Sequence, residues 1–431
     1  MSPVRKSASK KRVRLGLRRL FGALPRGLRF WLYRRMVSVQ VQPDAELEFK
    51  IAETAQELEA CFRLLHDAYV GAGFMKPDPS GMRITIYHAL PTTTTLCAKY
   101  RGEVVGTISI IREGVFGFPM QAIFDLEPVR ARGGQIAEIS ALAVSPAFRK
   151  TGGEVLFPLM KYMREYCERY FDTRHLVIAV NPDRIEMYEA LLTFDRLVER
   201  QVDHYDFANG APAVGASFDQ QSAPGRFRRL FGGRPAGRNL HRYFYDLKLP
   251  QFSWPQRRYH TTNDPVMTPA LLDHFFNRLS PVLSGLDDRK KALLWTIYDQ
   301  PDYKPMLPTL SPSGDADGGH PLRNCRRFSM RCPAQIEYAD EAGKGVYVVA
   351  VIDISHSGFQ AESRLPLPLD REGEAVVELG EGKRSVLRAR AVRRKDTQGG
   401  AFYGFRFEES DAPWRECISA FEMGYTYRDI R

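Results

Sequence analysis

The hydrophobic pattern of this 431-residue chain changes at residues 311–321, a segment rich in Ser, Gly, Asp and Pro. Before it, strand-like and helical patterns alternate over residues 46–206, which predicts an α/β layered domain. After it, short strand-like runs separated by turn signals are followed by one helical stretch, residues 414–424. This second pattern predicts a small β-barrel or sandwich with a C-terminal helix.

These patterns predict four parts of the chain: an arm (1–44), an α/β domain (45–310), a linker (311–322) and a β domain (323–431). A stretch near residues 209–237, rich in Gly, Ala, Pro and Ser, is predicted to be a flexible insertion in the α/β domain. Residues 269–299 have a helical pattern again. No stretch beyond the arm reaches the length that is needed to span a bilayer.

The excess of positive charge is confined to the arm. Twelve of the 62 Lys and Arg residues lie within residues 1–42, which contain no Asp or Glu, so the other residues carry 50 basic against 51 acidic side chains. The folded body is therefore close to neutral, and its charge gives no support to a nucleic-acid partner.

The arm has the pattern of an amphipathic helix, with a kink expected at Pro25. Its apolar residues recur at steps of three and four between arginines: Val13, Leu17, Leu20, Phe21, Leu24, Leu28, Trp31 and Leu32. Such a helix favours an anionic membrane surface, where each basic residue contributes about 1 kcal/mol. Docking of the apolar stripe on the protein's own body is one alternative, and contact with RNA or an acidic protein is another. Arg26 and Arg29 interrupt the apolar core that a secretion signal needs.

The cysteines suggest neither a metal site nor a disulfide framework. All six are scattered, with no CxxC spacing and no His/Cys cluster: Cys61, Cys97, Cys167, Cys325, Cys332 and Cys417. We therefore expect no metal and a reducing compartment. The predicted location is the cytoplasm, with the arm placing the chain at the inner face of the cytoplasmic membrane if it binds lipid.

Two short motifs stand at the start of the β-rich region and at the end of an apolar strand about two dozen residues later. The first contains Arg326, Arg327 and Arg331, and the second contains Asp353, Ser355 and Gly358. Either motif alone is more often a solvated charge run or a plain turn. Together, in this order and in this β pattern, they resemble the RxxxR loop and the [D/N]xSxxG strand end of the PilZ domain.

The resemblance implies a closed β-barrel that binds the bacterial second messenger cyclic di-GMP. Planar guanidinium groups bind phosphates and guanine edges in bidentate fashion, so the arginines would clamp the nucleotide. Asp353 and Ser355 would contact a base. Gly358 would let the backbone approach closely or take a positive φ.

A third motif lies in the α/β domain, at residues 138–154. A strand ends in Val-x-Pro-x-x-Arg and is followed by a Gly-containing turn and a helix, which resembles the acyl-donor loop of the GNAT superfamily of acyltransferases. Backbone N–H groups of such a turn and helix N-terminus bind phosphate. The resemblance implies an acyl-donor site made of Leu142, Ala143, Val144, Arg149, Lys150, Gly152 and Gly153.

Residues 180–194 resemble the GNAT segment that ends in Tyr-x-x-x-Gly-Phe, which makes Tyr188 the candidate for protonating the leaving thiolate. As a whole, the region resembles the N-acyl amino acid synthases and the related acyl-homoserine lactone synthases. That resemblance implies that Glu138 is the general base for the attacking amine. The alternatives are a surface or ion-paired role for Glu138 and an apolar helix-face role for Tyr188.

The chain departs from the family pattern at three positions: Ala141 replaces Arg, Glu154 replaces Gly or Ala, and Thr193 replaces Gly. A carboxylate at Glu154 repels the diphosphate of coenzyme A more than the single phosphate of an acyl carrier protein.

The resemblances therefore predict a cyclic di-GMP-responsive N-acyltransferase that moves a long-chain acyl group from acyl carrier protein, or from coenzyme A, to an amine such as an amino acid. The alternative is a cyclic di-GMP-binding effector whose GNAT-like domain is a non-catalytic scaffold for protein or membrane contacts.

Overall fold

The computed structural model describes residues 21–113, 116–149, 151–171, 173–255, 267–298, 301–309, 328–340, 343–380, 382–397 and 400–422. The predicted linker, Lys150, Arg326 and Arg327 lie outside these residues. Within the described part of the chain, no helix has the length and apolar character that crossing a membrane requires.

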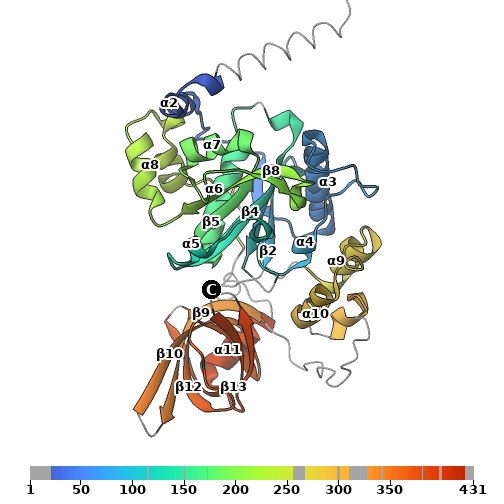
Figure 1. Ribbon diagram of the computed structural model, residues 1–431, viewed down its shortest axis with the longest axis vertical. Coiled ribbons are helices and arrows are strands. Elements are labelled where there is room, and N and C mark those ends of the chain that lie inside the picture. The colour runs from blue at the N-terminus through green and yellow to red at the C-terminus, as the bar shows by residue number, and fades with distance from the viewer. Residues whose placement is uncertain are drawn as a thin grey trace, which may run out of the picture.

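An eight-stranded mixed sheet forms the core of the region before the linker (Figure 1). Its strands run in the order β1 (Leu47–Ile51), β2 (Thr93–Tyr100), β3 (Glu103–Arg112), β4 (Gln135–Val144), β5 (Thr173–Val180), β8 (Ala211–Asp219) and β6 (Asp195–Arg196), and β7 (Val202–Tyr205) also pairs with β8. The pair β4–β5 is parallel and the other neighbours are antiparallel. The predicted strands at 47–51, 95–100, 104–111, 136–144 and 175–180 are all present.

Helices cover both faces of this sheet. On one face, α3 (Ala55–Ala72) packs against β3 and β4. It begins with the capping box Thr54–Glu57, which satisfies its first backbone N–H groups, and ends at Gly73 in the left-handed region. On the other face, α6 (Leu156–Phe171) packs with α8 (Ala223–Phe231) in the largest apolar cluster. We call these sides the α3 face and the α6 face.

The remaining elements before the linker are short or lie at the edges. They are α2 (Arg26–Met36), α4 (Ile86–Ala89), η1 (Pro119–Ala122), α5 (Glu127–Arg130), η2 (Pro146–Phe148), α7 (Pro182–Leu192), η3 (Asp206–Ala208), η4 (Ala236–Arg238), η5 (Arg242–Asp246), α9 (Pro269–Asp273), η6 (His274–Arg278), α10 (Asp288–Ile297) and η7 (Pro301–Met306). The helical pattern over 269–299 thus forms separate segments. Leu272, Phe275 and Leu294 of these segments pack in one cluster with α3.

The predicted flexible insertion near residues 209–237 is wrong. These residues form β8, which pairs with β5 over six positions, and α8, which buries Phe227 and Phe231. The small residues of β8 are required by packing, because a Cβ on Gly215 would lie 2.9 Å from the ring of Phe124. The Gly and Ala residues therefore belong to a tightly packed inner strand. The neighbouring Pro and Ser residues, which resemble turn signals, led to the prediction of a flexible insertion.

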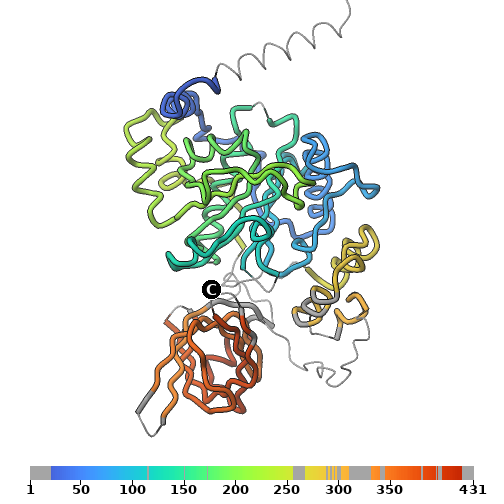
Figure 2. Tube along the Cα trace, viewed as in Figure 1, coloured from blue at the N-terminus to red at the C-terminus, as the bar shows by residue number. Residues whose placement is uncertain are grey.

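The described end of the arm docks on the protein through its arginines. Arg29 Nε donates to Glu186 of α7 at 2.9 Å, and Arg26 forms an ion pair with Glu189 of the same helix at 2.7 Å. Leu28 and Trp31, which belong to the predicted apolar stripe, are 43% and 50% exposed. Figure 2 shows this blue segment beside α7 and α8, two helices that lie far from the segment in the sequence. The helix therefore docks on the protein's own body, but not in the way that the docking alternative predicts, because Arg26 and Arg29 make ion pairs with α7 while Leu28 and Trp31 of the stripe remain exposed.

After the linker, six strands close into a barrel in the order β10 (Gly343–Ser355), β11 (Gly358–Ser363), β14 (Gly400–Arg406), β13 (Lys383–Thr397), β12 (Glu372–Gly380) and β9 (Phe328–Asp340). The helix α11 (Ala412–Glu422) buries Trp414 and Ile418 against it. The predicted fold class, an α/β GNAT-like mixed sheet followed by an all-β PilZ barrel with a C-terminal helix, is confirmed.

Candidate functional site

The sheet opens between β4 and β5. These strands pair only from Gln135 to Glu138 on β4, although β4 continues to Val144 and β5 to Val180. The register of β4 with β3 also shifts between Thr107 and Ser109, opposite Ala141, whose φ is +53°. A non-glycine residue in the left-handed region costs about 1–3 kcal/mol and is typical of functional sites. The bulge at Ala141 bends β4 away and leaves a gap in the sheet.

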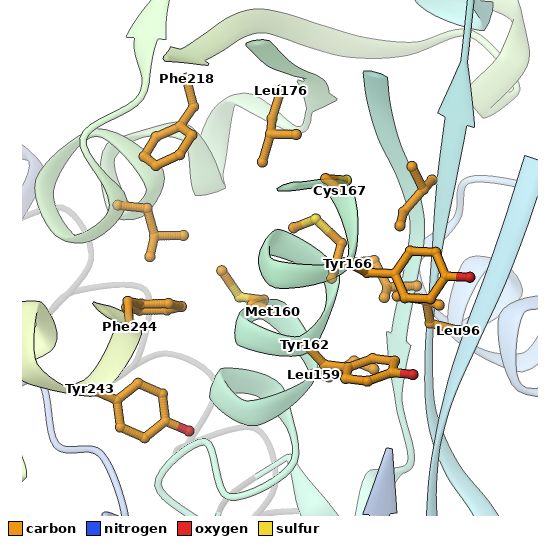
Figure 3. Packing of buried hydrophobic residues seen from close by; sticks show 14 of the residues in the cluster. Leu96, Leu159, Met160, Tyr162, Tyr166, Cys167, Leu176, Phe218, Tyr243 and Phe244 are labelled. Atoms are coloured by element: carbon orange, nitrogen blue, oxygen red, sulfur yellow. The ribbon is translucent and has the colours of Figure 1, made fainter. Parts of the chain in front are cut away.

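A cavity of ≈ 550 Å³ occupies this gap, within the range of about 300–1,000 Å³ that is usual for small-molecule sites. Its lining is mainly apolar on the α6 face, where α6, α8, β5, β8 and η5 contribute side chains. Figure 3 shows four of these residues around one space: Met160, Leu176, Phe218 and Phe244. A cavity with such walls suits an acyl chain.

The cavity also reaches the α3 face, because Tyr69 and Phe74 belong to its lining. Ser140 lines it from β4, and Arg149, Asn181 and Tyr188 line it near the strand ends. The gap therefore joins an apolar pocket on one face to a more polar region on the other. Two substrates approaching from opposite faces would meet at the ends of β4 and β5.

The predicted donor loop lies at one end of this cavity. Leu142, Ala143, Val144 and Arg149 all line it. Arg149 Nε donates to the carbonyl of Val144 at 2.8 Å, which folds the side chain back over the strand end.

The glycine turn of the donor loop precedes α6. Gly152 and Gly153 both have positive φ, +71° and +86°, and successive backbone N–H groups in such turns form concave anion sites. A Cβ on Gly153 would lie 2.5 Å from the ring of Phe157, so only glycine fits there. Glu154 is half-buried.

Tyr188 lines the cavity from α7, as Val144 and Phe194 do from neighbouring segments. Its ring meets that of Phe194 edge-on, with the centroids 5.7 Å apart. Burial raises the pKa of its hydroxyl to about 12, so the group is protonated at neutral pH and can donate a proton. Thr193, which replaces the family's glycine, adopts the left-handed conformation itself, at φ +59°. The backbone therefore keeps the shape that glycine would give it.

Glu138 lies on β4 with its side chain on the α3 face, and it is 2% exposed. Its Oε2 accepts a hydrogen bond from the backbone N–H of Met120 at 2.9 Å. Burial raises the pKa of the carboxyl to about 8, although this hydrogen bond lowers it. The side chain does not line the cavity, but it lies two residues before Ser140, which does, and on the same face of the strand. The surface alternative for Glu138 is excluded.

Sequence reasoning missed a group of buried polar residues on the α3 face. Arg83, 7% exposed, makes cation–π contacts with the rings of Tyr69 and Phe207, and Tyr205 has a buried hydroxyl with no hydrogen-bond partner in the described part of the chain. Glu138 raises the pKa of Tyr87 and of Tyr205 further, beyond the larger effect of their burial. No spacing in the sequence links these residues, because they come from four separate segments that only the fold brings together.

In the barrel, the two halves of the nucleotide motif lie on adjacent strands. The antiparallel register of β9 and β10 places Asp353 opposite Ser329 and Ile354 opposite Phe328. The segment with Arg326 and Arg327 ends immediately before Phe328, and Arg331 is part of β9. The sequence separation of the two motifs therefore becomes spatial proximity at one end of the barrel.

The second motif also has structural roles. Ser355 Oγ donates to the carbonyl of Gly358 at 2.9 Å and is buried, and the indole N–H of Trp414 donates to the carbonyl of Ser355 at 3.0 Å. A Cβ on Gly358 would lie 2.3 Å from the carbonyl oxygen of Phe405. Close approach of two strands therefore requires this glycine.

A split mixed sheet with a cavity in the split, followed by a closed six-stranded barrel, is a GNAT-like fold followed by a PilZ-type barrel. Residues 60–219 match the family model of the N-acyl amino acid synthase FeeM, and residues 321–423 match the model of the PilZ domain. The recognition of both regions from the sequence is confirmed, and so is the enzyme class, an N-acyltransferase.

Solved structures of both kinds are similar to parts of the chain. The N-acyl amino acid synthase FeeM from uncultured soil microbes is 24% identical, with a TM-score of 0.36, over 43% of this chain and 95% of that chain. The CoA-dependent acyl-homoserine lactone synthase BjaI is 20% identical, with a TM-score of 0.31, over 45% and 92%. YcgR from Escherichia coli, in complex with c-di-GMP, is 16% identical, with a TM-score of 0.21, over 24% and 46%. A comparison with curated protein sequences found no match.

Proposed function

We propose that this N-acyltransferase moves a long acyl chain from a carrier thioester to the amine of an amino acid and that its barrel binds cyclic di-GMP. The observation that carries the first part is the apolar cavity in the gap between β4 and β5. A small acetyl group would leave most of ≈ 550 Å³ unfilled, whereas a long acyl chain buries apolar surface at about 25 cal/mol per Å².

In the proposed mechanism, the thioester carbonyl lies at the strand ends and the acyl chain extends along the α6 face. Glu138, directly or through water, removes a proton from the ammonium group, and the neutral amine attacks the carbonyl carbon. The C–N bond forms and the C–S bond breaks. Tyr188, whose hydroxyl is protonated, gives its proton to the leaving thiolate, and the second proton that the new amide nitrogen loses restores the Tyr188 hydroxyl.

We propose acyl carrier protein as the donor. Its phosphopantetheine brings a single phosphate to the turn at Gly152 and Gly153, which tolerates the neighbouring Glu154 better than a diphosphate would. Arg149 supplies positive charge at the same end of the cavity. Carrier proteins are acidic, so basic residues around this entrance would also guide their association.

The proposal for cyclic di-GMP rests on the arginine motif, which is intact in the sequence, and on the β9–β10 ladder, which places Ser329, between Arg327 and Arg331, opposite Asp353. Guanidinium groups of Arg327 and Arg331 suit the phosphates and guanine edges of the nucleotide. The exposed Leu28 and Trp31 of α2, together with the basic arm, further support a cytoplasmic protein held at an anionic membrane surface.

The test is release of free thiol and formation of N-acyl product from acyl carrier protein and from acyl-CoA, with a panel of amino acids and simple amines. We expect transfer by the full chain and a loss of about 10²–10⁴-fold in kcat/KM for Glu138→Gln. Tyr188→Phe should lower kcat more than it raises KM. Absence of transfer from every donor to every acceptor by folded protein would overturn the proposal and favour a scaffold role.

A further inference from the structure

Arg83 is a buried cation with an unusual setting. It follows α3 and is 7% exposed, and its guanidinium lies 4.3 Å from the ring centroid of Tyr69 and 4.8 Å from that of Phe207. Its Nη2 donates to the carbonyl of Phe207 at 2.8 Å. The contacts with two aromatic rings and the hydrogen bond to Phe207 restrain the planar group, so its orientation is set before any ligand arrives.

Among the residues that the structure describes, no carboxylate lies within ion-pair distance of Arg83, and the carbonyl of Phe207 is the one acceptor that its guanidinium meets. Burial lowers the pKa of Arg83, but a guanidinium stays protonated in proteins. Burial and Arg83 together lower the pKa of His88 to about 3, so that neighbour is neutral. A buried, unpaired charge is costly, and this site therefore favours an anion.

Another buried arginine shows what a structural role looks like. Arg112 lies over the ring of Phe171, as Arg83 lies over Tyr69, but it donates from both terminal nitrogens, to Thr94 Oγ1 at 2.7 Å and to the carbonyl of Pro91 at 3.1 Å. The fold thus satisfies the guanidinium of Arg112 from within. At Arg83 it leaves donors for something else.

Arg83 is connected to the candidate active site through tyrosines. Tyr69, the ring on which it lies, lines the cavity, and Tyr69 also interacts electrostatically with Tyr188. On the other side, Tyr205 interacts electrostatically with both Arg83 and Glu138. The guanidinium of Arg83, the carboxyl of Glu138 and the part of the cavity lined by Tyr69 therefore share the α3 face. The apolar part of the cavity, where the acyl chain is proposed to bind, lies on the α6 face.

We propose that Arg83 binds the carboxylate of the acceptor and thereby selects α-amino acids over amines that lack an acid group. This inference rests on the proposed function. An α-amino acid carries its amine on the carbon next to the carboxylate, so anchoring the acid at Arg83 fixes the amine on the side of Glu138. The buried hydroxyl of Tyr205 is a second donor for the same carboxylate.

The test uses N-dodecanoyl amino acids and the matching carboxamides, which differ only in the charge of the group that Arg83 would bind. Calorimetry on the full chain measures both Kd values, and competition with the acceptor in the transfer assay gives the same preference under turnover. The variants are Arg83→Gln and Arg83→Lys, with Arg112→Gln as a control for loss of a buried arginine that is satisfied internally.

We expect wild type to bind the acid at least about tenfold more tightly than the amide, because the amide lacks one charge-assisted hydrogen bond to Arg83. Arg83→Gln should abolish this preference, Arg83→Lys should keep part of it, and Arg112→Gln should leave it unchanged. If Arg83→Gln keeps the preference for the acid, the inference about Arg83 is wrong. The proposed function would still stand as long as the enzyme transfers acyl groups. Absence of binding by either ligand to folded wild type would overturn both.

Discussion

Glu138 illustrates how one residue's surroundings set its chemistry. The carboxyl is buried beside the backbone of Met120, and its pKa is raised to about 8. A base must be deprotonated, so we expect kcat/KM of the wild type to rise with pH up to about 8 and then to level off. A pH–rate profile with a saturating donor measures this. A profile that is already flat from about pH 5 upward, near the ordinary carboxyl value, would contradict the assignment.

The same pKa predicts a change in stability. Between the ordinary Glu value near 4.3 and about 8, the unfolded chain has lost this proton and the folded chain has kept it, so rising pH lowers the free energy of unfolding. Glu138→Gln cannot ionise and retains an acceptor for the N–H of Met120. Its Tm relative to wild type should therefore increase as pH rises through this window. The exposed Glu103→Gln is the control, and a Tm difference independent of pH would argue against burial of the carboxyl.

Gly358 gives a prediction for the barrel. A Cβ there would lie 2.3 Å from the carbonyl oxygen of Phe405, and backbone atoms cannot move aside cheaply. Gly358→Ala should destabilise the barrel by about 1–3 kcal/mol in denaturant unfolding. Gly404→Ala on β14 is the matched control, since its Cβ would make only an ordinary contact, 3.6 Å from Arg393. Equal stability of the two variants would contradict the close approach of the strands.

At the scale of elements, hydrophobic periodicity predicted the strands and helices that have one clear apolar face. It identified α3, α6 and five strands of the α/β sheet, and it placed the second nucleotide motif at the end of an apolar strand, β10. It failed for β8, because this strand lies between β5 and β6 and packs its backbone against the ring of Phe124, which requires Gly and Ala, residues that in sequence resemble a loop. Local composition cannot distinguish a crowded backbone from a free one.

In the candidate site, too, local sequence patterns indicated some residues and not others. Four donor-loop residues and Tyr188, predicted from motifs that are local in sequence, line the cavity, whereas Arg83, Tyr69 and Tyr205 come from separate segments and no motif indicated them. The burial of Glu138 also depends on tertiary structure, since the backbone N–H of Met120, 18 residues earlier in the chain, donates to its carboxylate. Motifs reveal the half of a site that one stretch of chain builds.

The helix α2 presents a prediction at this scale. Its arginines dock on α7 while Leu28 and Trp31 remain exposed, so the helix offers apolar side chains beside basic ones. We expect the full chain to sediment with vesicles that contain anionic lipid and Leu28→Ser, Trp31→Ser to weaken this binding several-fold. Val346→Ser, Val348→Ser, which removes two exposed valines of the barrel, is the matched control. Equal binding by both double variants would exclude α2 as the contact.

At the scale of the whole molecule, the arginine motif directly follows the linker in the sequence, so a nucleotide bound there as proposed would contact the chain next to the segment that connects the two folded regions. Regulation requires that the ligand bind two states of the chain with different affinity. If such states exist, the coupling is reciprocal: cyclic di-GMP changes the affinity for the acyl donor by the same factor by which the donor changes the affinity for cyclic di-GMP.

We expect this factor to lie between about 5 and 150. Calorimetry on the full chain can measure it in both directions, with a thioether analogue of the acyl donor that cannot transfer its chain. Arg327→Ala, Arg331→Ala should abolish nucleotide binding, because each lost charge-assisted contact costs about 1.5–3 kcal/mol, and should leave the donor's Kd at its nucleotide-free value. Unchanged Kd values in both directions, with tight binding of each ligand alone, would mean that the barrel acts on another partner and that the acyltransferase works independently of it.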